Sequence, residues 1–383
     1  MSDIAAETAF VRAGLSPPLP PPRQVVPMWQ RWNLFGGWLN TALTLLSLSL
    51  IWLFVWPAAK FLIVDAVWAG ASREDCLAQT LGREAGACWP FIAAKFSQFI
   101  YGFYPASERW RVDLTFLLGA GLLLPLLIPR LPYKALNSLV FFGIYPIAAF
   151  LLLVGGVFGL AHVETRLWGG LLITLVVAFT GMIVSLPLGV LLALARRSAM
   201  PVVQAAAVIF IEFWRGVPLV AVLFFATYML PLFLPPGWSI DALLRVLVGI
   251  ALFASAYMAE VVRGGLQAIP RAQYEAAAAL GLGYWRTMGL VILPQALRVV
   301  IPGIVNIFIG LFKDTTLVLT VAIFDLLGQL RAAFADPNWA SPATLFTGFA
   351  FAGLIYFAFC FGMSRYSLFV ERHLRTGYPR GAE

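Results

Sequence analysis

The chain has 383 residues, of which 61% are hydrophobic and only 11% are Asp, Glu, Lys or Arg, and its formal net charge is +8. A soluble domain carries about 25% charged residues, so this chain is too apolar to cover a water-facing surface. The composition excludes soluble enzymes, free-standing binding modules and disordered chains, and it is typical of a membrane protein with several spans. No basic stretch is interleaved with aromatic residues, so we expect no nucleic-acid partner.

The chain begins polar, from Met1 to Arg12, and then contains the proline-rich run Ser16-Pro-Pro-Leu-Pro-Pro-Pro-Arg23. Such a run favours extended polyproline II, which suits either a ligand for a Pro-binding domain or a plain tail. We expect residues 1–31 to be a cytoplasmic Pro-rich tail and residues 376–383 to be a second, short cytoplasmic tail.

Charge-free runs predict eight membrane-spanning helices, since a span needs about 20 apolar residues. In chain order the eight runs lie at residues 32–59, 114–129, 135–161, 167–195, 216–240, 246–259, 299–324 and 337–364. The fifth helix is expected to begin upstream, near Ala205, and the seventh run is interrupted by Lys313 and Asp314. The sequence therefore predicts an all-α polytopic membrane protein with both termini on one side.

Basic residues select the orientation, because cytoplasmic loops carry an excess of Lys and Arg. With the N-terminus inside, more of the 26 basic residues lie in inner segments than in outer ones. This orientation places both termini in the cytoplasm and a long loop, about residues 60–112, in the periplasm. Cys76 and Cys88 share that loop and could form a disulfide or stay as two free thiols. Neither histidine has a Cys or His at ligand spacing, so we expect no metal site.

The inner segment between the sixth and seventh spans, residues 263–296, is predicted to form two short helices. Gln273 to Leu280 are strong helix formers, and Gly281 to Gly283 can end that helix in a left-handed turn. Its four consecutive alanines make a slim helix that another protein's groove could approach closely. An ordinary cytoplasmic connector could have the same composition, so the spacing of the flanking residues decides between the two.

That spacing resembles the signature of permease subunits of ATP-binding-cassette importers. The signature is Glu-Ala-Ala, three residues, Gly, nine residues, then Ile-x-Leu-Pro; here Val291 replaces the usual Ile. In the family this loop is a coupling helix that docks on a separate ATPase subunit. The resemblance assigns this coupling role to Glu275, Ala276, Ala277, Gly281, Leu293 and Pro294. It also implies that ATP and Mg bind the partner ATPase and that this chain carries no cofactor.

Sequence motifs of catalysis are absent from the chain. It contains no G-x-x-x-x-G-K-[ST], no H-E-x-x-H and no G-x-S-x-G. We therefore expect no enzymatic activity on this chain.

A narrower resemblance covers about residues 166–375. Glu212-Phe-Trp-Arg215-Gly-Val-Pro218-Leu, Tyr257-Met-Ala-Glu260-Val-Val-Arg263 and Lys313-Asp-Thr-Thr-Leu317 are similar to elements of polar amino acid permeases, whose core has five spans. The preceding extension, residues 32–165, adds three spans and resembles the subunits of general L-amino acid and glutamate/glutamine/aspartate/asparagine importers. The resemblance implies a bacterial inner-membrane protein that works with a second permease subunit, identical or not, an ATPase dimer and a periplasmic amino-acid-binding protein.

Four charged residues lie within predicted spans, where charges are costly and usually functional. Glu212, Arg215, Lys313 and Asp314 could line the translocation path near the membrane midplane, or they could form ion pairs that only hold the bundle together. A secondary transporter driven by an ion gradient would need Glu212 or Asp314 to bind the ion. A membrane-embedded enzyme or scaffold is a third alternative, and it would need a catalytic constellation or no path at all.

Overall fold

A computed structural model describes residues 34–375 with the exception of residues 83, 129–130, 132 and 158. The predicted tails, residues 1–31 and 376–383, therefore lie outside the described residues. The described chain is helical, and its only other regular pairings are three isolated β-bridges. It divides into two compact units, one ending at Val64 and the other beginning at Asp65.

The first unit consists of the helix α3 (Trp38–Ala59) and the π-helical turn that continues it, Lys60–Val64. Together they form an apolar segment of 27 residues, which is long enough to cross a bilayer. No residue of α3 is buried, and the rings of Trp52 and Trp56 stack 5.2 Å apart on its surface. An unburied apolar helix of this length suits contact with lipid, as expected for the first predicted span.

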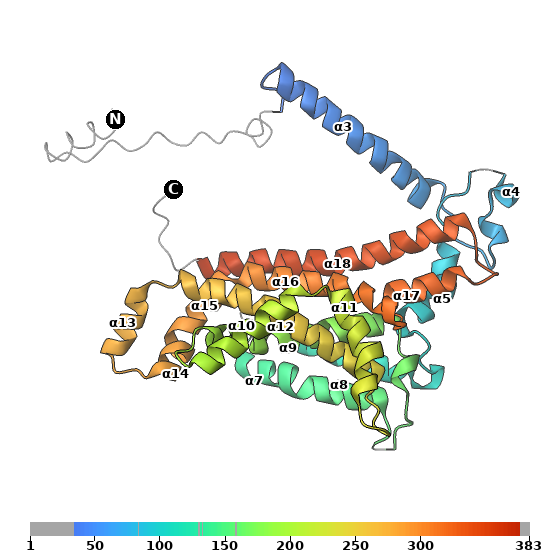
Figure 1. The fold of residues 1–383 in the computed structure, drawn as a ribbon. Coiled ribbons are helices and arrows are strands. Elements are labelled where there is room, and N and C mark those ends of the chain that lie inside the picture. The colour runs from blue at the N-terminus through green and yellow to red at the C-terminus, as the bar shows by residue number, and fades with distance from the viewer. Residues whose placement is uncertain (1–33, 83, 129–130, 132, 158, 376–383) are drawn as a thin grey trace. The chain divides into compact units, whose positions relative to one another are not determined.

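The second unit contains the remaining candidate spans (Figure 1). Six of them are built on α6 (Arg109–Leu127), α7 with α8 (Lys134–Leu139 and Tyr145–Val154), α9 (Gly170–Arg196), α12 (Ala242–Ala268), α16 (Ile301–Asp314) and α18 (Pro342–Arg375). One more is a bent pair, α10 (Pro201–Gly216) followed by the segment Leu219–Phe233, which begins with α11 (Leu219–Phe224). Over the described residues the structure thus has seven spans, or eight with the bent pair, and the predicted all-α polytopic fold is confirmed.

The fifth predicted span is sharply bent. The two parts of the pair are inclined by 102°. Val217 is extended (φ −103°, ψ 134°) and Pro218 precedes α11. A proline lacks an N–H group, and it also disfavours the helical conformation of the residue before it. The chain therefore breaks at Val217, and α10, which carries Glu212 and Arg215, is separated from the apolar segment that follows.

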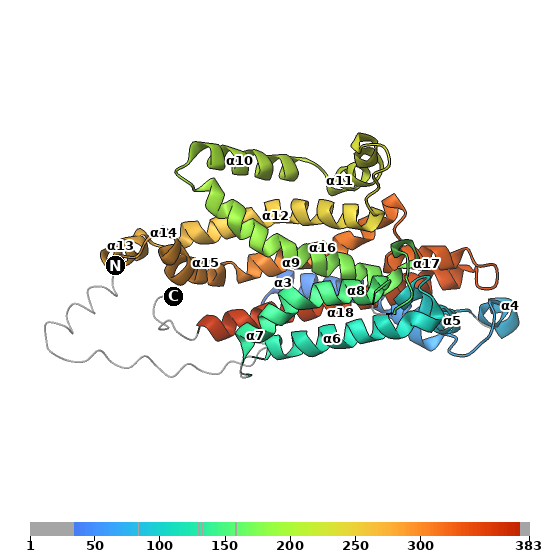
Figure 2. The ribbon, with the colours of Figure 1, turned by 90° about the horizontal axis from the view of Figure 1, so that it is seen from below.

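The centre of the second unit is α9, which packs along α12 and also contacts α10, α16 and α17 (Leu326–Phe334) (Figure 2). Small residues permit the close approach of α9 and α12. A Cβ atom on Gly189 would lie 2.6 Å from Cγ of Met258, so only glycine fits there without a shift. The second and third predicted spans belong to the same compact unit as the later spans. The helix α5 (Trp89–Tyr101), which precedes both, contacts α9, α17 and α18.

The segment predicted as a long polar loop, residues 60–112, contains the helix α5, which the sequence analysis did not predict. Phe91 and Phe99 on this helix are fully buried and pack in one cluster with Leu326 and Leu330 of α17. Both α5 and α17 are short and lie among charged residues, so a search for long charge-free runs misses them. Lys95 Nζ on α5 lies 2.5 Å from Asp336 Oδ2, and this contact holds the pKa of the Asp336 carboxyl below its usual value.

Cys76 and Cys88 form a disulfide in this segment, with the two sulfurs 1.99 Å apart and the Cα atoms 5.7 Å apart. Both cysteines are buried, and the Cys88 N–H donates a hydrogen bond of 2.8 Å to Thr347 Oγ1 on α18. The bridge therefore lies beside the contact between the outer segment and α18.

Removing this bridge should loosen the outer segment. For a loop of this length a disulfide contributes about 2–4 kcal/mol. We expect the double variant Cys76→Ser/Cys88→Ser to be cleaved by trypsin at the exposed Arg73 at least tenfold faster than the parent, as followed by gel electrophoresis. The matched control is Cys360→Ser, which removes the free cysteine of α18 and should change nothing. Equal cleavage rates in the two variants would contradict a bracing role.

Close backbone contacts join the outer segment to the start of α9. The Phe103 N–H donates to the Leu167 carbonyl (3.1 Å), and the Gly170 N–H donates to the Phe324 carbonyl (2.9 Å). Gly102 has φ +65°, and a Cβ there would lie 2.4 Å from the Cα of Gly169. These contacts define what we call the glycine junction: Gly102, Gly169 and Gly170.

Candidate functional site

The helix α13 (Arg271–Ala279) lies at one end of the second unit, and α4 (Ala78–Leu81), α5 and α17 lie at the opposite end (Figures 1 and 2). Pro270 precedes α13 as its N-cap residue rather than lying in the first turn. Ala277 is buried, whereas Glu275, Ala276, Ala278 and Ala279 are exposed. The exposed face of α13 is therefore narrow, because it consists largely of alanine side chains.

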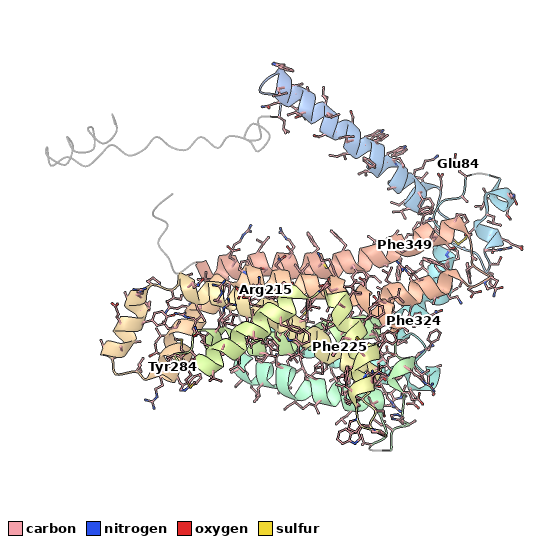
Figure 3. The ribbon with its side chains drawn as sticks, viewed as in Figure 1. Glu84, Arg215, Phe225, Tyr284, Phe324 and Phe349 are labelled. Atoms are coloured by element: carbon pink, nitrogen blue, oxygen red, sulfur yellow. A yellow bond between two sulfur atoms is a disulfide. The ribbon has the colours of Figure 1, made fainter. Side chains whose placement is uncertain are left out.

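The apolar surface continues beyond α13. Leu280 is 79% exposed and Trp285 is 72% exposed, and Tyr284 lies at the same end of the bundle (Figure 3). Exposed large apolar side chains beside a slim helix are typical of a surface that another protein covers.

The C-terminus of α13 is closed by a glycine-dependent turn. Gly281 has φ +73°, as predicted, and its N–H donates to the Ala278 carbonyl at 2.9 Å. The Leu282 N–H donates to the Ala277 carbonyl at 3.1 Å. These two bonds form a Schellman motif, which requires the left-handed conformation that glycine adopts without steric cost.

Leu293 and Pro294 lie apart from the exposed face of α13, at the start of α15 (Leu293–Val299). Between them and Gly281 the chain forms α14 (Tyr284–Arg286) and the π-helical segment Thr287–Ile292. Gln295 Nε2 donates to Gln273 Oε1 at 3.2 Å, which ties α15 back to α13. The six predicted coupling residues thus fall into two groups. Four lie on α13 and its C-terminal turn, and Leu293 and Pro294 lie at the start of α15, which leads to the next span.

A contact that the sequence analysis missed links α13 to the core. Arg197, at the C-terminus of α9, lies over the ring of Tyr274 with Cζ 5.7 Å from the ring centroid. Its Nη1 donates to Tyr274 Oη (3.1 Å) and to the Leu266 carbonyl of α12 (3.3 Å). The only sequence signal was the Arg196-Arg197 pair at the end of a span, which the orientation rule had already explained. A displacement of α13 would therefore act directly on the ends of α9 and α12.

Glu212 and Arg215 belong to a larger set of charges, which we call the inner charge cluster: Arg196, Glu212, Arg215, Glu260 and Arg263. The predicted pair itself is loose, with Arg215 Nη1 3.8 Å from Glu212 Oε2. Arg196 of α9 makes a closer contact, with Nη1 3.0 Å from Glu212 Oε1. Three helices, α9, α10 and α12, thus contribute to one set of charges.

Glu260 of α12 is the centre of the inner charge cluster. Its Oε1 accepts from Arg196 Nη1 at 2.6 Å, and its Oε2 accepts from Nη2 (2.6 Å) and Nε (2.8 Å) of Arg263. Its side chain is only 15% exposed, whereas that of Glu212 is 53% exposed. Three arginines and two glutamates leave one positive charge in excess. Glu260 lies eight residues, or about 12 Å, from the end of α12 and only about five residues from its middle, whereas Arg196 is the last residue of α9, so the cluster extends from the α13 end of the bundle toward the middle of this span.

The structure does not join Lys313 and Asp314 to this cluster. Both lie at the C-terminus of α16, where the helix tightens into the 3-10 segment Thr315–Val321. Within the described ranges neither residue makes an ion pair, and Lys313 is exposed while Asp314 is half-buried. The two predicted charge pairs are therefore separate features. No group of three His, Cys, Asp or Glu side chains in the described chain is arranged to hold a metal ion.

Comparison with known proteins places these features in a family. Residues 185–376 match the binding-protein-dependent transport system inner membrane components. The chain is 51% identical over 350 residues to the inner membrane amino-acid ABC transporter permease protein YhdY of Escherichia coli (strain K12), covering 91% of this chain and 93% of that protein. It is 42% identical over 442 residues to the glutamate/glutamine/aspartate/asparagine transport system permease protein BztC of Rhodobacter capsulatus, covering 97% and 100%.

Shorter relatives match only part of the chain. The probable glutamine ABC transporter permease protein GlnP of Bacillus subtilis is 34% identical over 198 residues. That alignment covers 52% of this chain but 88% of GlnP. Long and short relatives therefore exist, and the long ones extend over almost the whole chain.

Proposed function

Because the chain belongs to the binding-protein-dependent transport system inner membrane components, we propose that it moves L-amino acids into the cell as a permease subunit of an ATP-driven importer. Members of this family are multi-pass permeases that work with ATPase subunits and substrate-binding proteins. Two relatives that match more than nine-tenths of the chain carry amino-acid permease names, which supports this class of substrate. The importer lies in the bacterial inner membrane, with both termini of this chain in the cytoplasm. The outer segment, with its disulfide, then faces the periplasm, where disulfides persist.

The observation that carries the proposal is the surface of α13. Its exposed alanines and the exposed Leu280 and Trp285 stand at one end of the spans, where an ATPase subunit can cover them. ATP and Mg are bound by that partner, and the chain itself is not an enzyme. When the two ATPase subunits close, α13 moves with them and pulls on the ends of α9 and α12 through the contact of Arg197 with Tyr274.

The test is reconstitution of the complete importer in liposomes. That importer comprises two permease subunits, identical or different, two ATPase subunits and a periplasmic amino-acid-binding protein. We expect ATP hydrolysis to rise when the loaded binding protein is added and labelled amino acids to accumulate. Uptake driven by a proton or sodium gradient without any ATPase subunit would overturn the proposal. The cluster geometry argues against Glu212 as the ion-binding acid of that alternative, because Glu212 is already paired with Arg196 and Arg215.

The inner charge cluster, in which Glu212 is the most exposed side chain, is the proposed polar part of the translocation path for a zwitterionic substrate. We expect the double variant Glu212→Gln/Arg215→Gln to lower uptake at least tenfold or to change the order of preferred amino acids. The change removes one charge of each sign, so the net charge of the cluster is unchanged.

The matched control for this variant is Glu164→Gln/Arg166→Gln. It removes a second Glu–Arg ion pair, which is exposed and lies outside the spans. Uptake assays with the same binding protein compare the two double variants. Wild-type selectivity and wild-type uptake in Glu212→Gln/Arg215→Gln would show that the pair is purely structural.

A further inference from the structure

A cavity of about 410 Å³ lies between α6, α8 and α9. It is therefore located at the seam between the predicted three-span extension and the predicted five-span core. Its walls are formed mainly by leucine, phenylalanine and alanine side chains from candidate spans, together with Trp168 just before α9. Phe150 on its rim is 50% exposed, so the cavity opens on a surface that faces the hydrocarbon of the bilayer.

The polar groups of the cavity define what it could bind. Tyr145 Oη donates to the Thr115 carbonyl at 3.0 Å, and Thr115 Oγ1 donates to the Arg111 carbonyl at 2.8 Å, so these hydroxyls have partners within the protein. The indole of Trp168 is different. Its side chain is buried, with 3% of the residue exposed, and its Nε1–H finds no acceptor among the described residues. An unpaired buried donor costs about 1–3 kcal/mol, so an occupant with an oxygen acceptor at this position would be favoured.

The dimensions of the cavity match one hydrocarbon chain. On α9 its lining runs from Leu171 to Ile183, about 18 Å along the helix axis. This length is comparable to the half-thickness of the hydrocarbon core, about 15 Å. A volume of 410 Å³ spread over that length leaves a cross-section of about 20 Å², whereas a helix is about 10 Å wide. A second transmembrane helix therefore does not fit, while an extended acyl chain does.

The structure assigns this cavity to a phospholipid, with one acyl chain lying along α9 and an ester carbonyl accepting the hydrogen bond from Trp168. The lipid belongs to the leaflet at the Trp168 end of α9, which is the outer leaflet in the orientation of the proposed function. It fills the seam between α6 and α8 on one side and α9 on the other. It thereby acts as a structural partner of the permease and is no substrate.

Photo-crosslinking of the complete importer in proteoliposomes tests this assignment. The probe is phosphatidylethanolamine that carries a diazirine in one acyl chain, and adducts are mapped by mass spectrometry of peptides. We expect adducts to concentrate on the lining segments of α6, α8 and α9. Ala149→Trp, which fills the cavity from α8, should lower these adducts at least fivefold, and Ala120→Trp should do the same from α6.

Matched variants separate the site from ordinary lipid contact. Ala148→Trp changes the neighbouring residue of α8, which does not line the cavity, and should leave the adducts unchanged. Trp168→Phe keeps an aromatic ring but removes the N–H donor, and it should lower the adducts about two- to tenfold. This readout does not depend on transport, so its failure and the failure of the proposed function are distinguishable.

Two outcomes would overturn the assignment. One is an equal density of adducts on lining and non-lining lipid-facing peptides, unaffected by Ala149→Trp and Ala120→Trp. The other is efficient disulfide formation between a cysteine at position 149 and cysteines along α3, which would show that a helix of this chain occupies the seam.

Discussion

Gly281→Val should abolish the stimulation of ATP hydrolysis by the loaded binding protein while the permease still reaches the membrane. The φ of +73° at Gly281 costs a residue with a side chain about 1–2 kcal/mol, and a β-branched residue more. The turn that satisfies the Ala277 and Ala278 carbonyls would open, and the surface of α13 and Leu280 would lose its shape. The measurement is ATPase activity of the reconstituted importer with and without the binding protein, for which we expect at least a tenfold loss of stimulation.

Gly283→Val is the matched control, since Gly283 has φ −67° and ψ 164°, a conformation open to any residue. Open space surrounds a Cβ at either glycine, so the two variants differ in backbone strain rather than in clashes. Gly281→Asn should be intermediate, because asparagine tolerates the left-handed region better than valine does. If Gly283→Val lost stimulation as fully as Gly281→Val, the conformation of the turn would not be the cause.

Gly102→Ala should strongly destabilise the second unit. A Cβ at this position would lie 2.4 Å and 2.5 Å from the Cα and N atoms of Gly169, which are backbone atoms that cannot rotate away. The positive φ costs about 1–2 kcal/mol and the overpacking costs about 1–3 kcal/mol more. A typical protein has only 5–15 kcal/mol of stability, so we expect the yield of monodisperse protein in gel filtration to fall at least fivefold.

Two control variants separate the clash from the strain. Gly82→Ala has nearly the same φ, +61°, and open space around the new Cβ, but its ψ of 14° is that of the left-handed helix whereas Gly102 has ψ −129°, so it should show a lower bound of the strain without the clash. Gly121→Ala, inside α6, has open space and no strain, and it should be neutral or slightly stabilising. A Gly102→Ala protein that behaved like Gly82→Ala would show that the glycine junction relaxes readily.

The spans could be read from the sequence because each is a long run whose apolar character is independent of its neighbours. The same holds for α13, where alanines favour a helix and Gly281 ends it within a few residues. Local rules were enough for these elements. The bend between α10 and α11 depends on packing against α12, and its size could not be foreseen.

The rest depends on contacts between residues far apart in the chain. The helix α5 is buried only because α17 and α18 cover it, so its charges and short length conceal it from any search along the sequence. Glu212 has Arg215 three residues away on the same helix, but its closest basic partner is Arg196 on another helix. Spacing along one helix reveals local pairs, and it cannot reveal that Glu260 lies within ion-pair distance of arginines from three helices.

The packing of α5 on α17 bears on how long and short permeases are related. If the chain were cut at residue 165, the removal of Phe91 and Phe99 would uncover Leu326 and Leu330 of α17, which are now fully buried. Relatives that match only about half of this chain must therefore shield the corresponding face in another way. The extension, through α5, packs into a hydrophobic cluster of the permease core. Its gain or loss during evolution would require compensating substitutions on α17 and α18, so it cannot be exchanged between permeases as an independent module.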